Sequence, residues 1–264
     1  MSKRPAPASN KAPNAISKRR KITSTSTATY NTVPRTRGVY AAGEHKYFDT
    51  SGSATLARTE AWTGTTVDPS TLNTLVVPVQ GAAIWQRIGR EIAVHKLRIN
   101  GYFQMGGVNN LSADFIAAQL ARVIVVQDMQ TNADQMKGEQ LFTNAVNGTV
   151  SPNAPLMAFQ NLDNFGRFKV LKDKVYSLAN PNFANDGTDP TKKDYCALVK
   201  HFKFNINFAK PIRIRFNASN AGTVADIVDN SFHILANCRN FGGVDATQPP
   251  VSISYRCRAV YSDA

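Results

Sequence analysis

The chain has 264 residues, 42% of them hydrophobic, so it is long enough to bury a substantial core. Its formal net charge of +13 favours an anionic partner such as nucleic acid. The sequence shows no apolar run that could span a membrane and no signal peptide, so we expect no membrane insertion. Three cysteines, Cys196, Cys238 and Cys257, are too few and too scattered for a disulfide framework or a zinc site. We expect them to be buried in strands in a reducing compartment.

The first 37 residues differ from the rest of the chain. They contain nine Lys and Arg residues, no Asp or Glu, and few large apolar side chains. Such a segment cannot bury enough surface to offset its ordering entropy, so we predict a disordered basic arm over residues 1–43. We predict that the arm binds nucleic-acid phosphates through Lys3, Arg4, Lys11, Lys18, Arg19, Arg20, Lys21, Arg35 and Arg37.

One compact basic block stands out within the arm, formed by Lys18, Arg19, Arg20 and Lys21. Its composition fits a solubilising tail, a nuclear import signal or a phosphate-binding segment. The arm has few aromatic residues to interleave with its cations, so base stacking is not expected to be its main mode of binding.

The next part of the chain predicts strands from Glu44 onward. A first strand over Glu44–Thr50 and Thr55–Trp62 is interrupted at Ser51-Gly52-Ser53, and a short apolar run follows at Leu75–Val79. The stretch Gln80–Phe103 begins with an arginine-rich loop and continues as an alternating strand. The alternation slips at His95-Lys96, which predicts a β-bulge.

The middle of the chain predicts two further strands with a long connection between them. Ala117–Asp128 contains the apolar run Val123–Val126, typical of a strand buried on both faces. Gly138–Asn161 is a long connection with one short helical turn around Glu139–Phe142, and connections of this length are usually functional or interfacial. Arg167–Leu178 then predicts a basic strand.

The last part of the chain alternates cleanly between apolar and polar residues. The predicted strand segments are Val199–Phe208, Ile212–Phe216 after Lys210-Pro211, Ser231–Ala236 and Val251–Tyr261. Most of the roughly eight predicted strands have one apolar face, which favours two packed antiparallel sheets. We therefore predict an all-β fold, a single eight-stranded antiparallel jelly-roll sandwich over residues 44–264, with no linker that would divide it.

Catalytic and metal-binding motifs are missing from the sequence. The four histidines, His45, His95, His201 and His233, have no spaced companions for a metal, and there is no nucleophile elbow or phosphate-binding glycine loop. Four loop acids could bind calcium between subunits, but they match no defined cage: Asp128, Asp134, Asp186 and Asp189. We expect no enzymatic activity, no metal and no cofactor.

A second group of cations lies on the polar faces of late strands: Lys203, Arg213, Arg215, Arg256 and Arg258. Together with Lys169, Lys172 and Lys174 they would make one outer face or rim basic if the sheets share an orientation. Such a surface could continue the phosphate binding of the arm, or it could be ordinary solvated strand charge. We expect no exposed stacking aromatics beside these cationic strands.

The arm, the strand-like Lys46-Tyr47-Phe48-Asp49, and Gln80-Gly81 leading to Gln86–Ile92 resemble the capsid proteins of small circular single-stranded DNA viruses that encode their own replication initiator. The Gln-Arg-x-Gly segment is also similar to coat proteins of satellite tobacco necrosis virus type. The resemblance implies a jelly-roll subunit, a T=1 icosahedral shell of 60 copies, and an arm that lies inside on the genome.

The resemblance also implies a virion and host-nuclear location, with Lys18–Lys21 recognised by host nuclear import factors. It makes Arg87, Arg90 and the late-strand cations possible contacts to other subunits or to the genome. Hydrogen bonds to loop carbonyls are the alternative role for Arg87 and Arg90. Phosphate contacts do not distinguish DNA from RNA, and the resemblance favours single-stranded DNA.

Two other functions fit the same sequence. One is a nuclear β-sandwich that binds nucleic acid or acts as a chaperone through a basic tail. The other is a carbohydrate-binding sandwich, although no Trp-lined site is visible. Self-assembly into uniform shells would favour the capsid protein, and tight oligonucleotide binding by a monomer would favour the nuclear protein.

Overall fold

The computed structural model describes residues 44–56, 62–63, 74–105, 118–142, 156–179, 198–240 and 251–264. The chain divides into two units, Met1–Tyr40 and Ala41–Ala264, and every described residue belongs to the second unit. All the nucleic-acid-binding and nuclear-import residues predicted for the arm therefore lie outside the described residues.

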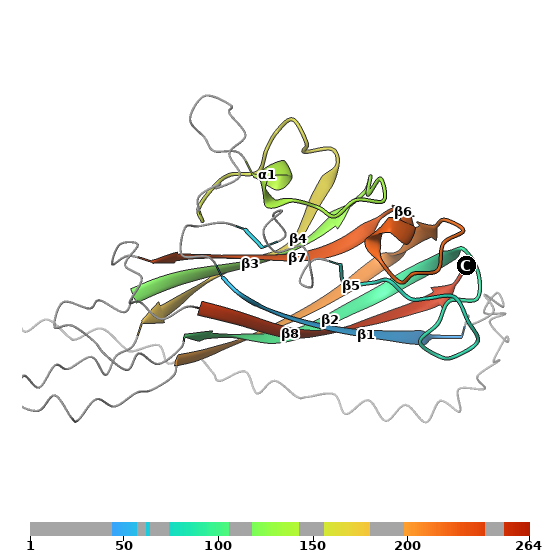
Figure 1. Ribbon diagram of the computed structural model, residues 1–264, viewed down its shortest axis with the longest axis horizontal. Coiled ribbons are helices and arrows are strands. Elements are labelled where there is room, and N and C mark those ends of the chain that lie inside the picture. Colours follow the sequence, from blue (N-terminus) through green and yellow to red (C-terminus); the bar gives the residue numbers. More distant parts are fainter. Residues whose placement is uncertain are drawn as a thin grey trace, which may run out of the picture. The chain divides into compact units, whose positions relative to one another are not determined.

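The described residues form two antiparallel β-sheets that pack face to face (Figure 1). Sheet A contains, in spatial order, β1 (Lys46–Thr55), β8 (Val251–Asp263), β2 (Glu91–Met105), β5 (Leu198–Phe216) and β6 (Ile227–Asp229). Sheet B contains β4 (Phe168–Ala179), β3 (Ala118–Asp128) and β7 (Ser231–Asn240). Two short helical segments accompany them, α1 (Gly138–Leu141) and the 3₁₀ turn η1 (Val224–Asp226).

The strand order is that of a jelly roll. The first strand, β1, pairs with the last, β8, and β2 lies between β8 and β5. In the other sheet, an isolated bridge from Thr74 to His233 places the chain after β1 at the β7 edge. The chain thus crosses repeatedly between two antiparallel sheets, and this strand order confirms the predicted all-β jelly-roll sandwich.

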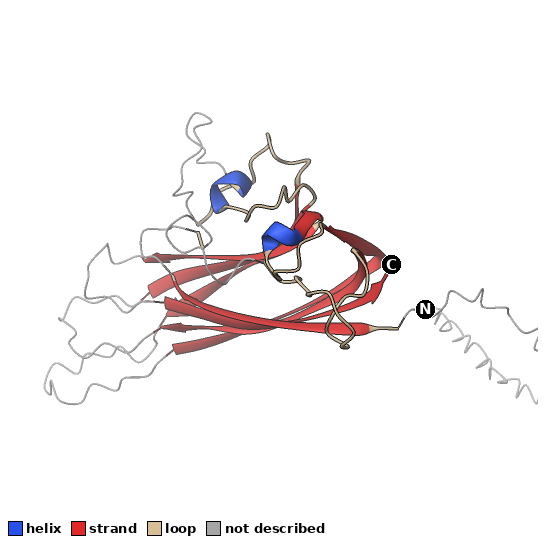
Figure 2. Ribbon diagram, turned by 45° about the vertical axis from the view of Figure 1, so that its right-hand side comes forward, coloured by secondary structure: helices blue, strands red, loops and turns tan. Residues whose placement is uncertain are grey.

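The main hydrophobic core fills the space between the two sheets, and a second core lies on the outer side of sheet B. Val123 and Val125 of β3 pack in the main core, whereas Ile124 and Val126 pack in the second one. This confirms that β3 is buried on both faces. The second core is closed by Trp62 and by residues of α1 and its neighbouring loops, which lie on the sheet B side (Figure 2).

The predicted bulge in β2 is present. The register of β2 shifts between Val94 and Lys96 against both β5 and β8. Val94 pairs with Ile212 of β5, and Lys96 pairs with Asn207. The residues of β5 between Asn207 and Ile212, which include Pro211, therefore have no partner on β2. Because no ladder hydrogen bond is lost at Pro211, β5 continues through it as one 19-residue strand.

Several predicted boundaries differ from the observed ones. The predicted interruption of the first strand at Ser51-Gly52-Ser53 is wrong, because β8 pairs with β1 continuously through these residues. The bridge to β7 is made by Thr74, just before the apolar run Leu75–Val79, and β6 was not predicted. The predicted helical turn around Glu139–Phe142 is confirmed as α1.

Candidate nucleic-acid and subunit interfaces

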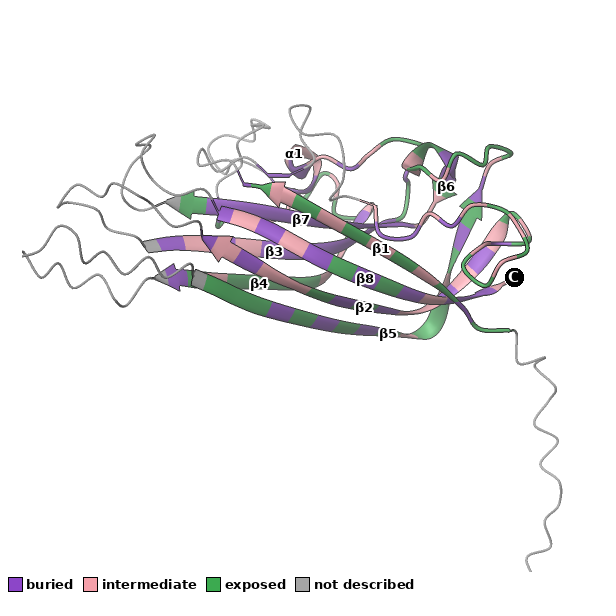
Figure 3. Cartoon of the chain, turned by 60° about the horizontal axis from the view of Figure 1, so that its bottom comes forward, coloured by how far each residue is buried: buried purple, intermediate pink, exposed green. Residues whose placement is uncertain are grey.

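The outer face of sheet A is not covered by any other described element, in contrast to the outer face of sheet B. Figure 3 shows this face, on which buried and exposed residues alternate along the strands. On β5, Phe202 and Phe204 point into the core, and Lys203 between them is exposed. The period-two pattern therefore presents one polar side chain per two residues from each strand to solvent.

Strand register arranges the outward side chains of sheet A in rows across the sheet. One row runs from Lys203 through Asn100 and Arg256 to Ser51. The next row contains Asn205, Arg98, Arg258 and Asp49. These two rows bring together four cations from three strands. Three of them, Lys203, Arg256 and Arg258, were predicted from the sequence, and Arg98 was not.

Three of these four cations have no ion-pair partner among the described residues. Asp49 accepts two hydrogen bonds from Arg258, at 2.7 and 2.6 Å, and this interaction lowers the pKa of Asp49. Asp49 is the only acid in the described rows, so the positive charge of Arg98, Lys203 and Arg256 is not neutralised within the described face. Exposed and unneutralised cations on a sheet are suited to phosphate binding.

The other predicted cations do not belong to this surface. Arg213 bonds Glu91 at 2.9 Å, and Arg215 Nε bonds Asp229 at 2.7 Å, beyond the β2 bulge. Lys169, Lys172 and Lys174 lie on β4 in the other sheet. The condition for one basic face made by all eight cations is not met, because the two sheets turn their outer faces in opposite directions.

Aromatic rings lie beside the cations, contrary to the sequence-based expectation. Tyr102 and His201 are outward neighbours in the row adjacent to Lys203 and Arg256, with ring centroids 6.0 Å apart. Sequence reasoning missed them because the register between β2 and β5, which sets them side by side, is not visible in either strand alone. Alternation with the buried neighbours Phe103 and Phe202 places both side chains on the outer face.

Arg87, predicted as a possible contact residue, is completely buried. Its guanidinium donates hydrogen bonds to the carbonyl oxygens of Pro78, Gly89 and Ser219 at 2.7–3.1 Å. Burial lowers the pKa of Arg87. Arg87 therefore has the alternative role expected from the sequence, which is to stabilise the loop by hydrogen bonds to carbonyl oxygens. Arg90, in contrast, is exposed.

The loop that Arg87 stabilises presents apolar side chains to solvent. Ile84, Trp85 and Ile88 are each more than half exposed. The backbone of the loop is fixed by hydrogen bonds between Gly81 and Arg87 and between Arg87 and Val79. Exposed Trp on a rigid loop is characteristic of protein contact surfaces. We call Ile84, Trp85 and Ile88 the Trp85 loop surface.

A second exposed apolar group lies between α1 and β4. Met157, Phe159, Leu162 and Phe165 are all at least 63% exposed. The loop is held at both ends by arginines: Arg122 donates to the carbonyls of Leu156 and Ala158, and Arg167 bonds both carboxylate oxygens of the buried Asp128. We call these four residues the Phe159 loop surface. The connection Gly138–Asn161, predicted to be functional or interfacial, includes Met157 and Phe159 of this surface, and its residues 143–155 lie outside the described residues.

Polar groups in the interior have structural roles. Ser231 Oγ lies 2.6 Å from His233 Nε2 and 2.7 Å from Thr131 Oγ1, but all three residues are fully buried and out of reach of a substrate. Cys257 is buried, which raises its pKa to about 12. Cys238 is buried as well, and its thiol donates a hydrogen bond to Gln119 Oε1 at 3.5 Å.

Metal ligands do not cluster in the described part of the chain. No group of three or more His, Cys, Asp or Glu side chains is found there, and Asp128 is occupied by Arg167. Asp186 and Asp189 lie outside the described residues. No helix among the described residues has the length and apolar character needed to cross a bilayer.

Comparison with known proteins finds no matching protein family and no matching curated protein. Weak similarity is found to solved viral capsid proteins. Infectious bursal disease virus VP2 in a subviral particle gives a TM-score of 0.23 at 6% identity, over 84% of this chain and 38% of that chain. Merkel cell polyomavirus VP1 with GD1a oligosaccharide gives 0.19 at 7% identity, over 83% and 96% of the two chains.

Trichodysplasia spinulosa-associated polyomavirus VP1 with 3'-sialyllactose gives a TM-score of 0.17 at 7% identity, over 82% of this chain and 94% of that chain. The chain spans well under half the length of the VP2 protein. These superpositions are too loose to show a shared fold. The jelly-roll assignment depends instead on the strand order and register of the chain itself.

Proposed function

We propose that this chain is a viral capsid protein that assembles with copies of itself into a small icosahedral shell and packages a single-stranded genome. The observation that carries the proposal is the pairing of an acid-free basic arm with a jelly-roll body whose sheet A has an unneutralised cationic face. Both features favour binding to a polyanion.

The arm supplies most of the proposed genome binding. Its nine cations would contact phosphates without reading base sequence, so the affinity should fall steeply with salt. In a shell of 60 copies the arms would contribute about 540 positive charges to the interior. Within the arm, Lys18–Lys21 would also act as a nuclear import signal, so that the protein would occur in the host nucleus and in the virion.

The two apolar loop surfaces supply the proposed subunit contacts. The Trp85 loop surface and the Phe159 loop surface come from different parts of the chain. Each is held by arginine hydrogen bonds to backbone carbonyls, from the buried Arg87 and from the partly buried Arg122. A contact between two different surfaces is heterologous, and repeated heterologous contacts can close into rings and shells. Arg90, Arg213 and Arg215 are further exposed groups that could lie at such contacts.

The nuclear nucleic-acid-binding protein remains the second candidate. The cationic face of sheet A, with Tyr102 and His201 beside it, favours this candidate as well, because a monomer could bind single strands there. The two functions differ in whether binding requires assembly.

The test is expression of the full chain followed by electron microscopy of the purified protein. We expect uniform shells that protect nucleic acid from added nuclease, with the extracted polymer sensitive to deoxyribonuclease. A protein that stays monomeric at all salt concentrations while binding oligonucleotides tightly would support the nuclear protein and contradict the capsid protein.

A further inference from the structure

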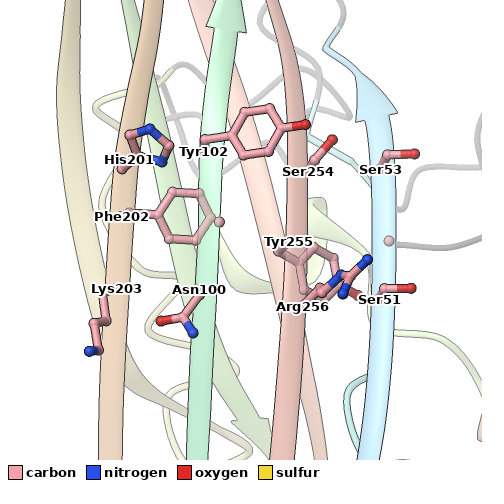
Figure 4. Close-up of a pocket in the computed structure, with 12 residues that line it drawn as sticks. Ser51, Ser53, Asn100, Tyr102, His201, Phe202, Lys203, Ser254, Tyr255 and Arg256 are labelled. Carbon is pink, nitrogen blue, oxygen red and sulfur yellow. The ribbon is translucent and has the colours of Figure 1, made fainter.

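An open hollow lies on the outer face of sheet A, between two adjacent rows of side chains (Figure 4). Its volume is about 910 Å³, within the range of small-ligand sites. One wall is the row of His201, Tyr102, Ser254 and Ser53, and the other is the row of Lys203, Asn100, Arg256 and Ser51. Four strands, β5, β2, β8 and β1, therefore contribute to it.

The second wall carries two cations at a spacing suited to a polyanion. Lys203 and Arg256 pair with the same residue, Asn100, from opposite sides, so they are two strands apart, or about 10 Å. Both are exposed, and neither has an ion-pair partner among the described residues. Arg98 adds a third such cation in the following row.

The first wall carries two rings. Tyr102 and His201 meet edge to face, with an interplanar angle of 61°, so each ring keeps a face that is not stacked on the other. Base stacking on such rings is sequence-tolerant because every base has a π-face. An acidic peptide would use the cations but leave both rings unused, whereas a nucleotide uses both walls.

We infer that this hollow binds nucleotide units of a single-stranded nucleic acid, with a base against Tyr102 or His201 and phosphates beside Lys203 and Arg256. The inference rests on the proposed function and extends it. The body of the protein, and not the arm alone, contacts the nucleic acid, and the outer face of sheet A faces the genome.

The test is photo-crosslinking of the full chain to a ten-nucleotide oligothymidylate that carries 5-iodouracil, followed by mass spectrometric mapping. We expect crosslinks at Tyr102 or His201. The double variant Lys203→Gln/Arg256→Gln should lower their yield about tenfold, and Tyr102→Leu should do the same, whereas Tyr102→Phe should retain the crosslinks because it keeps the ring.

The matched control is Lys172→Gln/Lys174→Gln, which also removes two positive charges but from exposed positions of β4 in the other sheet, and should leave the yield unchanged. Crosslinks confined to residues 1–37, or equal losses in the two double variants, would overturn the inference while leaving the capsid proposal intact. Crosslinks at Tyr102 in a chain that never forms shells would support the inference and contradict the capsid proposal.

Discussion

The guanidinium carbon of Arg87 lies 4.5 Å from the centroid of the Phe216 ring, and this contact joins the loop before β2 to the end of β5. The same guanidinium bonds three carbonyl oxygens, so one buried side chain fixes the loop that carries Trp85. A surface that is already rigid loses less entropy when a partner binds.

We therefore expect Arg87→Met to destabilise the fold by about 3 kcal/mol, because the three carbonyls would lose their donors in a buried site. Denaturant unfolding measures the change. Arg90→Met, three residues away and exposed, should stay within about 0.5 kcal/mol of the wild type. Equal effects of the two substitutions would show that Arg87 does not hold the loop.

Gly101 in β2 lies under the ring of Phe202 on the inner side of sheet A. A Cβ at this position would lie 2.3 Å from Phe202 Cζ and 2.7 Å from the carbonyl oxygen of Ser254. Because the second contact is with backbone, Gly101→Ala should cost about 1–3 kcal/mol in unfolding free energy. Gly166→Ala is the control, since no atom lies within 4 Å of its Cβ position. A neutral Gly101→Ala would contradict the packing described.

His95, at the β2 bulge, should make stability depend on pH. Desolvation by burial, and secondarily the neighbouring His45, lowers the pKa of His95. In the unfolded chain His95 has its ordinary pKa of about 6.5, so the unfolded chain binds a proton at His95 more readily than the folded chain. The contribution of neutral His95 to the free energy of unfolding is therefore present above about pH 6.5 and is lost as the pH falls below that value. Denaturation midpoints at pH 7.5 and 5.0 should differ less for His95→Gln than for the wild type. The same difference in both proteins would exclude His95 as the cause.

Trp85 should be required for assembly and not for folding. Trp85→Ser removes an exposed ring, so the subunit should keep its unfolding midpoint, but each contact should weaken by about 2 kcal/mol or more. Sedimentation velocity should then show subunits in place of shells. Val199→Ser, an exposed apolar residue on β5 outside both loop surfaces, is the control and should still assemble. Normal shells from Trp85→Ser would remove this loop from the interface.

The fold could be predicted from the sequence wherever the signal was local. The slip at His95-Lys96, the apolar run Val123–Val126 and the alternation of Phe202 with Lys203 each depend on neighbouring residues, and each prediction is confirmed. At Ser51-Gly52-Ser53 local propensity was misleading, because pairing with β8 outweighs the weak strand preference of these residues.

The candidate site was only partly predictable because it depends on register between strands far apart in the chain. Lys203 and Arg256 were recognised individually, but their common neighbour Asn100 and the adjacent Tyr102–His201 pair follow from the pairing of β2 with β5 and β8. The burial of Arg87 likewise depends on Ser219 and Phe216, more than 100 residues later in the chain. No local pattern carries this information.

The most direct test of the central claim is to neutralise the arm in the full chain, with all nine Lys and Arg residues of positions 1–37 replaced by Gln. The nuclease-protected nucleic acid per shell is then measured for this variant and for the wild type at the same salt concentration. We expect shells of the same diameter that protect only a small fraction of the wild-type amount, because most phosphate contacts are lost. Shells that package the wild-type amount would contradict the proposal that the basic arm packages the genome.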